Sequence, residues 1–164
     1  MDSIEHNQLL ADLASGDDDR AEAAALALGR LGEDSLPGIR DLLSNLSVDC
    51  RWWATRALGA LDGEAASAIP ALIGRLADPS VYVGQLAADS LARIGPAATP
   101  HLIAALDEGT PSVRGRAARA LAHIADPQSI PALITALDDE NPIVEYYADI
   151  ALQKMGVGTV LLKV

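Results

Sequence analysis

A pair of leucines recurs five times along this chain with the same internal spacing. In each copy, a Leu in a short apolar segment is followed 15 residues later by a Leu in a longer one: Leu13 and Leu28, Leu43 and Leu58, Leu76 and Leu91, Leu106 and Leu121, Leu137 and Leu152. The second leucines are 30, 33, 30 and 31 residues apart. A period of this length predicts a fold of stacked repeats, in which each copy buries its apolar face against its neighbours.

The columns around the second Leu identify the repeating element as helical. Four residues before it stands Ala24, Ala54, Ala87, Ala117 or Ala148, and three residues after it stands Leu31, Leu61, Ile94, Ile124 or Met155. Steps of three and four residues place these side chains on one stripe of a helix. No segment alternates as a strand would, so each copy is predicted to be a pair of antiparallel helices.

Prolines, capping turns and glycines mark the ends of these helices. A proline opens the first helix in copies two to five (Pro37, Pro70, Pro100, Pro131), a position where its missing N–H has no helical partner to lose. Capping turns at 78–80, 109–112 and 139–142 precede second helices, and Gly32, Gly63, Gly95 and Gly156 are predicted to end them.

The last copy, IPALITALDDENPIVEYYADIALQKMG, resembles the short HEAT-like repeat named after phycobilisome lyases, and the resemblance covers nearly the whole chain. It implies an all-α fold, a right-handed α-solenoid (superhelix) of about five antiparallel helix pairs of HEAT/armadillo type. Second helices would line the concave side. We therefore predict one domain, 1–156, with repeats at about 4–32, 36–63, 69–95, 99–126 and 130–156, followed by an apolar C-terminal tail, 157–164.

All five aromatic residues fall on the second helices, away from the predicted core stripe. Trp52 and Trp53 stand six and five residues before Leu58, as Tyr146 and Tyr147 do before Leu152, while Tyr82 precedes Leu91 by nine. The core columns hold aliphatic residues instead. Exposed rings and arginines are typical of binding hot spots. Alternatively, Trp53 and Tyr147, which lie nearer the stripe, pack against a neighbouring repeat.

Charge is distributed unevenly between the helices. From eight residues before each second Leu to three after it, the five copies hold nine basic and four acidic residues, whereas the rest of the chain holds three and nineteen, giving the net charge of −11. This count predicts a basic inner face. The acidic runs at 17–19 and 138–140 are interpreted as solvated helix-start charges that form no site.

These patterns predict a concave binding groove with Trp52 and Tyr146 as anchors and Arg56 and Arg119 as anion contacts. Arg51 and Arg114, beside the stripe, are instead expected to clamp acidic loop residues of an adjacent repeat. The predicted groove comprises Trp52, Trp53, Arg56, Tyr82, Gln85, Asp89, Arg93, Arg116, Arg119, Tyr146 and Tyr147.

Catalytic and metal-binding patterns are missing from the sequence. His6, His101 and His123 fall in different repeats without a second ligand three or four residues away, and Cys50 occupies a core column. No phosphate-binding Gly-rich loop or nucleophile motif occurs. The iron-binding hydroxylases built on HEAT repeats are similar in architecture alone, because their His-Glu dipeptides are absent here. We expect no metal, no cofactor and no catalytic residue.

Composition limits the partner and the compartment. The negative net charge argues against nucleic acid and anionic membranes, a single cysteine fits a reducing cytoplasm, and the N-terminal residues contain no signal-peptide pattern. We expect a cytoplasmic, non-enzymatic scaffold that binds an anionic or amphipathic peptide or protein, one with acidic groups, in its groove.

Several alternatives stay open. The resemblance allows a phycobilin lyase-like or bilin-chaperone subunit, whose open-chain tetrapyrrole would stack on the rings and pair its propionates with arginines. A HEAT-like DNA glycosylase using Trp52 and Asp89 is a more remote alternative. The tail, which includes the apolar stretch TVLLKV, could dock on the fifth copy, mediate homo-oligomer formation, or continue into a longer array.

Overall fold

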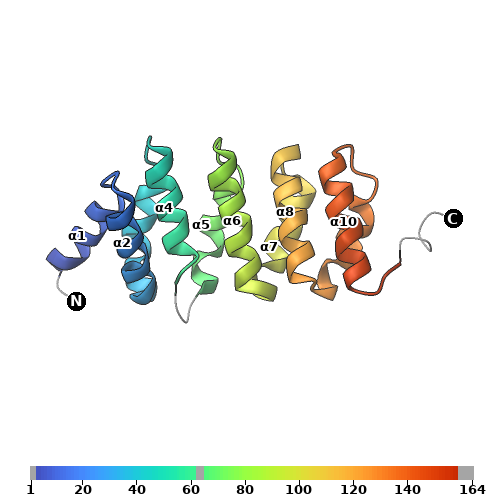
Figure 1. Cartoon of the computed structure of the whole chain (residues 1–164). Helices are drawn as coiled ribbons and strands as arrows, with labels where there is room; N and C mark the ends of the chain where they lie inside the picture. The colour runs from blue at the N-terminus through green and yellow to red at the C-terminus, as the bar shows by residue number, and fades with distance from the viewer. Residues whose placement is uncertain (1–2, 62–64, 159–164) are drawn as a thin grey trace. The chain divides into compact units, whose positions relative to one another are not determined.

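A computed structural model describes residues 3–61 and 65–158 of the chain. Within these ranges the secondary structure is α-helix and short 3₁₀ helix, with no strand, and the predicted all-α helical-repeat solenoid is confirmed. The chain forms two compact units, Met1–Ser90 and Leu91–Val164, with the boundary inside helix α6 (Figure 1). The single domain predicted over 1–156 stays a prediction.

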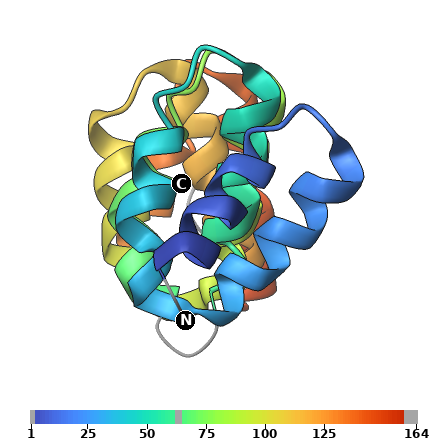
Figure 2. The ribbon, with the colours of Figure 1, turned by 90° about the vertical axis from the view of Figure 1, so that its left-hand side faces the viewer.

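The first unit contains the first two helix pairs and most of the third. Helix α1 packs against α2, α2 against α4, and α3 against α4. Figure 2 looks along this unit, with α3 on one side and α2 and α4 on the other. Its helices are α1 (Ser3–Leu13), α2 (Asp18–Arg30), α3 (Leu36–Leu42), α4 (Val48–Leu58), α5 (Ile69–Arg75) and the larger part of α6 (Val81–Ile94).

The second unit contains the end of α6 and the last two pairs. Helix α8 lies between α7 and α10 and contacts both, and α9 packs against α10. Its four complete helices are α7 (Thr99–Glu108), α8 (Pro111–Ile124), α9 (Ile130–Ala136) and α10 (Pro142–Lys154).

The core follows the predicted stripe. The second leucine of every copy is completely buried: Leu28, Leu58, Leu91, Leu121 and Leu152 each have 0% exposure. The alanines four residues earlier are buried as well, and their small side chains allow neighbouring helices to approach closely. Among the first leucines, Leu137 alone is half-buried.

Each proline-opened helix is preceded by a 3₁₀ helix that the sequence patterns did not predict. Pro37, Pro70, Pro100 and Pro131 are indeed the second residues of α3, α5, α7 and α9. The residue just before each of these helices is small and buried. In the first case, the single O–H of Ser35 is shared between two carbonyl oxygens, those of Leu28 at 2.9 Å and Gly32 at 2.8 Å. The 3₁₀ helices are η1 (Gly32–Ser35), η2 (Ala65–Ala68), η3 (Gly95–Ala98) and η4 (Pro127–Ser129).

Left-handed backbone ends most second helices, as the glycine pattern predicts. Gly32, Gly95 and Gly156 have φ of 61°, 83° and 76°. Gly63 lies outside the described residues, as does the tail from residue 159 onward. In the fourth copy the same conformation falls on Ala125, at φ 53° and ψ 42°. An alanine there is strained, because its Cβ crowds the following carbonyl oxygen.

Ala125→Gly should therefore stabilise the protein by about 0.5–1 kcal/mol, since relief of the left-handed strain exceeds the extra chain entropy of a glycine. The measurement is the free energy of unfolding from urea titration. Gly95→Ala is the reverse change at the equivalent position of the third copy and should destabilise the protein. Nothing lies within 4 Å of the added Cβ, so only backbone strain is introduced. If Ala125→Gly lowered stability, the strain argument would be wrong.

Candidate binding surface

None of the predicted groove residues is fully buried. In the first unit they lie on α4 and α6, in the second on the end of α6, α8 and α10. Tyr82 and Tyr146 are 74% and 60% exposed. Gln85 and Arg93 are also exposed, and the half-buried members are Trp52, Trp53, Arg56, Asp89, Arg116, Arg119 and Tyr147. The groove as a binding site remains a prediction.

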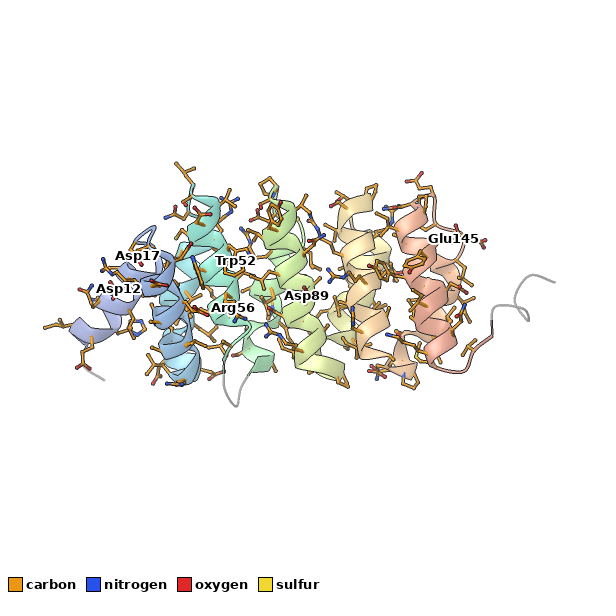
Figure 3. The ribbon with its side chains drawn as sticks, viewed as in Figure 1. Asp12, Asp17, Trp52, Arg56, Asp89 and Glu145 are labelled. Carbon is orange, nitrogen blue, oxygen red and sulfur yellow. The ribbon has the colours of Figure 1, made fainter. Side chains whose placement is uncertain are left out.

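The first unit has a hollow of about 380 Å³ where α2, α4 and α6 present their N-terminal halves. Three of the predicted aromatic residues meet here, Trp52 and Trp53 from α4 and Tyr82 from α6. Figure 3 shows Trp52 near the middle of α4, with Arg56 one turn further along the helix. The remaining lining residues are Asp18, Asp19 and Glu22 from α2, and Val48 and Asp49 from α4.

The two indole rings are held in a defined arrangement. Their centroids are 4.7 Å apart and their planes meet at 88°, an edge-to-face contact of the kind that aromatic quadrupoles favour. The Trp53 Nε1–H donates to the Asp18 carboxylate at 3.4 Å, a long hydrogen bond that links the ring to the neighbouring helix. Trp53 thus contacts the adjacent repeat, as one interpretation of its position predicted, and still lines the hollow.

The charge of this hollow is opposite to the sign predicted for the inner face. Four carboxylates line it and no basic residue does. The sequence count began eight residues before each second Leu and therefore left out Asp18, Asp19 and Asp49, which stand nine or ten residues before it. Glu22 occupies the same column as Trp52, six residues before the second Leu, so the repeat frame contained a signal for the acidic wall.

The acidic run at 17–19 has two roles rather than one. Asp17 caps α2, its carboxylate accepting the Arg20 backbone N–H at 3.0 Å, which agrees with the interpretation as a helix-start charge. Asp18 and Asp19 instead line the hollow. That the run forms no site stays a prediction, although two of its three residues line this hollow.

In the second unit, α8 and α10 lie side by side and carry the predicted aromatic and basic residues. The rings of Tyr146 and Tyr147 are 5.2 Å apart at 70°. Arg116 and Arg119 are on α8, which packs against α10. This surface therefore combines exposed ring area with guanidinium groups.

Two arginines clamp consecutive repeats, as predicted from their position beside the stripe. Arg51 donates to both Asp78 oxygens, from Nε at 2.9 Å and from Nη2 at 3.0 Å. Arg114 does the same to Asp139, at 2.7 and 2.9 Å. Each carboxylate also accepts a backbone N–H of its own loop, from Ser80 and Asn141 respectively.

The clamps lower the pKa of both aspartates. Burial by itself would raise the pKa of Asp78, but the hydrogen bonds from Arg51 and the Ser80 N–H, together with the charges of Arg51 and Arg75, outweigh it. At Asp139 the hydrogen bonds from Arg114 are the main cause of the lowered pKa. The 300 Å³ hollow between α7 and α9 is lined by this second ion pair, so we assign that hollow a structural role.

Other candidate chemistry is limited in the described ranges. Cys50 is buried in its core column, and burial raises the pKa of its thiol, which leaves it protonated and unreactive. No group of three or more His, Cys, Asp or Glu side chains in residues 3–61 and 65–158 is placed to hold a metal ion. No helix there is long and apolar enough to cross a bilayer.

The chain belongs to the HEAT repeat family, since the family model matches residues 7–92 and 99–161. This is a solenoid fold typical of protein-interaction scaffolds. No curated protein matches the sequence.

Solved structures with similar folds include enzymes as well as binding proteins. Human deoxyhypusine hydroxylase, in complex with glycerol, is 30% identical with a TM-score of 0.60; the match covers 74% of this chain but only 43% of the hydroxylase. The CpcE and CpcF complex of phycocyanin lyase from Nostoc sp. PCC7120 is 20% identical with a TM-score of 0.63, covering 92% of this chain and 99% of that one.

A designed armadillo repeat protein in complex with the peptide (KR)4 is 22% identical, with a TM-score of 0.51 and coverage of 95% and 84%. The likeness to the lyase and to the designed protein extends to the fold alone, so function has to be argued from this chain's own residues.

Proposed function

We propose that this chain is a non-catalytic protein-interaction module that binds a peptide segment or protein surface along the exposed sides of its second helices. The placement of the aromatic residues carries the proposal. Trp52, Tyr82 and Tyr146 all retain solvent exposure on second helices, whereas the core columns are filled by Leu and Ala. Tryptophan and tyrosine are enriched among the few residues that carry most of the binding energy at protein interfaces.

Acidic groups of the partner would contact the arginines beside these rings. Arg56 lies one turn from Trp52 on α4, and Arg116 and Arg119 lie on α8, adjacent to the tyrosines of α10. A planar guanidinium binds a carboxylate through two parallel hydrogen bonds, which favours specific recognition over general attraction.

The bilin-binding alternative has less support in the first unit. An open-chain tetrapyrrole with two propionates would bring negative charge to a hollow that Asp18, Asp19, Glu22 and Asp49 already line. The propionates and these carboxylates carry charge of the same sign and would repel one another. The same repulsion opposes a DNA phosphate backbone, which disfavours the glycosylase alternative.

Site-specific cross-linking in the native host tests the proposal. A photoreactive phenylalanine analogue would replace either Gln85 or Tyr146, exposed on second helices, or either His101 or Ile134, exposed on first helices. We expect cross-links to a polypeptide from the first two positions and not from the controls. Equal cross-linking from all four positions, absence of any cross-linked polypeptide, or co-purification of a visible pigment instead would contradict the proposal.

Trp52→Ala should weaken binding to the captured partner by about tenfold or more, as expected for an aromatic anchor. Its free energy of unfolding should change by no more than about 1 kcal/mol, because the ring is half-buried and the main interaction lost is its edge-to-face contact. Isothermal calorimetry measures the first quantity and urea denaturation the second. A large loss of stability would instead assign Trp52 to the core.

A further inference from the structure

We propose that the hollow of the first unit, which we call the acidic hollow, binds a cationic side chain from a basic peptide segment of the partner. Its residues are Asp18, Asp19, Glu22, Val48, Asp49, Trp52, Trp53 and Tyr82. The inference rests on the proposed function, because it names the partner's chemistry at one part of the same surface.

Ring faces are the first reason for a cationic ligand. The negative face of an indole or phenol ring attracts an ammonium or guanidinium group, and tryptophan does so most strongly. Trp52 and Trp53 stand nearly perpendicular, so they present ring surface in two directions around the hollow, and Tyr82 is highly exposed beside them.

Local charge is the second reason. Four carboxylates line the acidic hollow, and one of them, Asp18, is linked to a ring by the Trp53 Nε1–H. An uncharged or anionic ligand would leave this negative potential uncompensated, whereas a cation complements both the rings and the carboxylates. The combination of rings and carboxylates selects a cation, which neither feature does alone.

The surroundings favour a peptide over an isolated cation. Val48 and Val81, each at the N-terminus of its helix, are exposed beside Tyr82 and offer apolar contacts to the stem and neighbours of a long basic side chain. At about 380 Å³ the hollow is at the small end of ligand-pocket sizes, which suits one side chain rather than a large cofactor.

The tryptophans provide a selective readout of this site. The chain contains two tryptophans, and both line the acidic hollow. Intrinsic fluorescence and the two indole N–H signals in a ¹H–¹⁵N NMR spectrum therefore report occupancy here. Binding confined to α8 and α10 would leave both signals largely unchanged.

The probe is a short peptide of alternating Lys and Ala, titrated into the full chain. Its controls are the same peptide with every lysine acetylated, an alternating Glu and Ala peptide, and spermidine. We expect saturable changes in Trp fluorescence and in the indole N–H signals with the Lys peptide, weakening as salt is raised. The acetylated and Glu peptides should produce neither change.

Protein variants separate the site from general electrostatic attraction. The double variant Glu22→Gln and Asp49→Asn, which removes two exposed carboxylates of the hollow, should weaken Lys-peptide binding about fivefold or more. Asp41→Asn removes one exposed carboxylate on α3 of the same unit, outside the lining, and should have little effect.

The results of these titrations and of the cross-linking distinguish failure of the inference from failure of the proposed function. The inference would be overturned if the Trp signals responded to the Glu peptide, or responded to the acetylated peptide as strongly as to the Lys peptide. It would also be overturned if Asp41→Asn weakened the response as much as the double variant does, or if spermidine bound as tightly as the Lys peptide. No response to any peptide, with a partner still cross-linking to Gln85 and Tyr146, would overturn this inference and leave the proposed function intact. Failure of the cross-linking itself would overturn the proposed function.

Discussion

Asp78→Asn is expected to lower the free energy of unfolding by about 3–5 kcal/mol, because it leaves the Arg51 guanidinium buried without a countercharge. The side chains of Arg51 and Asp78 are 10% and 0% exposed, and two hydrogen bonds join them. The asparagine preserves the shape of the side chain, so the loss is electrostatic. Urea denaturation followed by circular dichroism measures it, with Asp41→Asn as the exposed control.

The second clamp provides an internal comparison. Arg114 and Asp139 are 16% and 13% exposed, so water compensates part of the broken pair. Asp139→Asn should therefore be less destabilising than Asp78→Asn. An equal or larger effect at Asp139 would contradict the dependence on burial.

The same ion pair has a predictable pH dependence. The folded state lowers the pKa of Asp78, so its stabilising contribution is fully present above the ordinary aspartate pKa of about 3.9 and is lost as the pH falls through the folded value. The difference in stability between the natural protein and Asp78→Asn should shrink in acid. A difference independent of pH from neutrality to pH 2 would point to packing as its cause.

Gly29→Ala is expected to cost about 1–3 kcal/mol, although alanine is the better helix former. An added Cβ would lie 2.6 Å from the Ala60 carbonyl oxygen, a backbone atom that cannot move aside without disturbing the end of α4. The measurement is again the free energy of unfolding.

Gly74→Ala is the matched control, since it lies in a helix of the same unit and its added Cβ would meet nothing within 4 Å. It should stabilise the protein by about 0.5–1 kcal/mol through helix propensity alone. If Gly29→Ala and Gly74→Ala changed the free energy of unfolding in the same direction, close packing at Gly29 would not be what determines the effect of the substitution.

The sequence predicted the fold well because its signals were periodic and local. Spacing of the leucines and alanines identified the buried stripe, and the prolines located the starts of α3, α5, α7 and α9. The 3₁₀ helices were not predicted because a buried Ser or Ala two residues before each proline carries little periodic information. Ala125 was missed because its left-handed conformation is imposed by the repeat rather than by its own preference.

The surface was predicted in part. Helix periodicity placed Trp52, Tyr82 and Tyr146 outside the core, and all three have exposed area. It did not predict that Trp52, Trp53 and Tyr82 meet carboxylates from α2 and α4, because such a juxtaposition depends on which helix ends converge in three dimensions. The charge count, which began eight residues before each second Leu, left out Asp18, Asp19 and Asp49 and so did not include most of the acidic lining.

The arginine clamps also constrain how the chain can be rearranged. Arg51 in the second copy holds the loop between the two helices of the third, and Arg114 in the fourth holds the loop between the two helices of the fifth. The same column has Ala21, Gly84 and Glu145 in copies one, three and five. Excising or transplanting any one of copies two to five would break a clamp, while moving copies two and three together, or four and five, would keep both of its members. The natural module for recombination in this protein is therefore two repeats long.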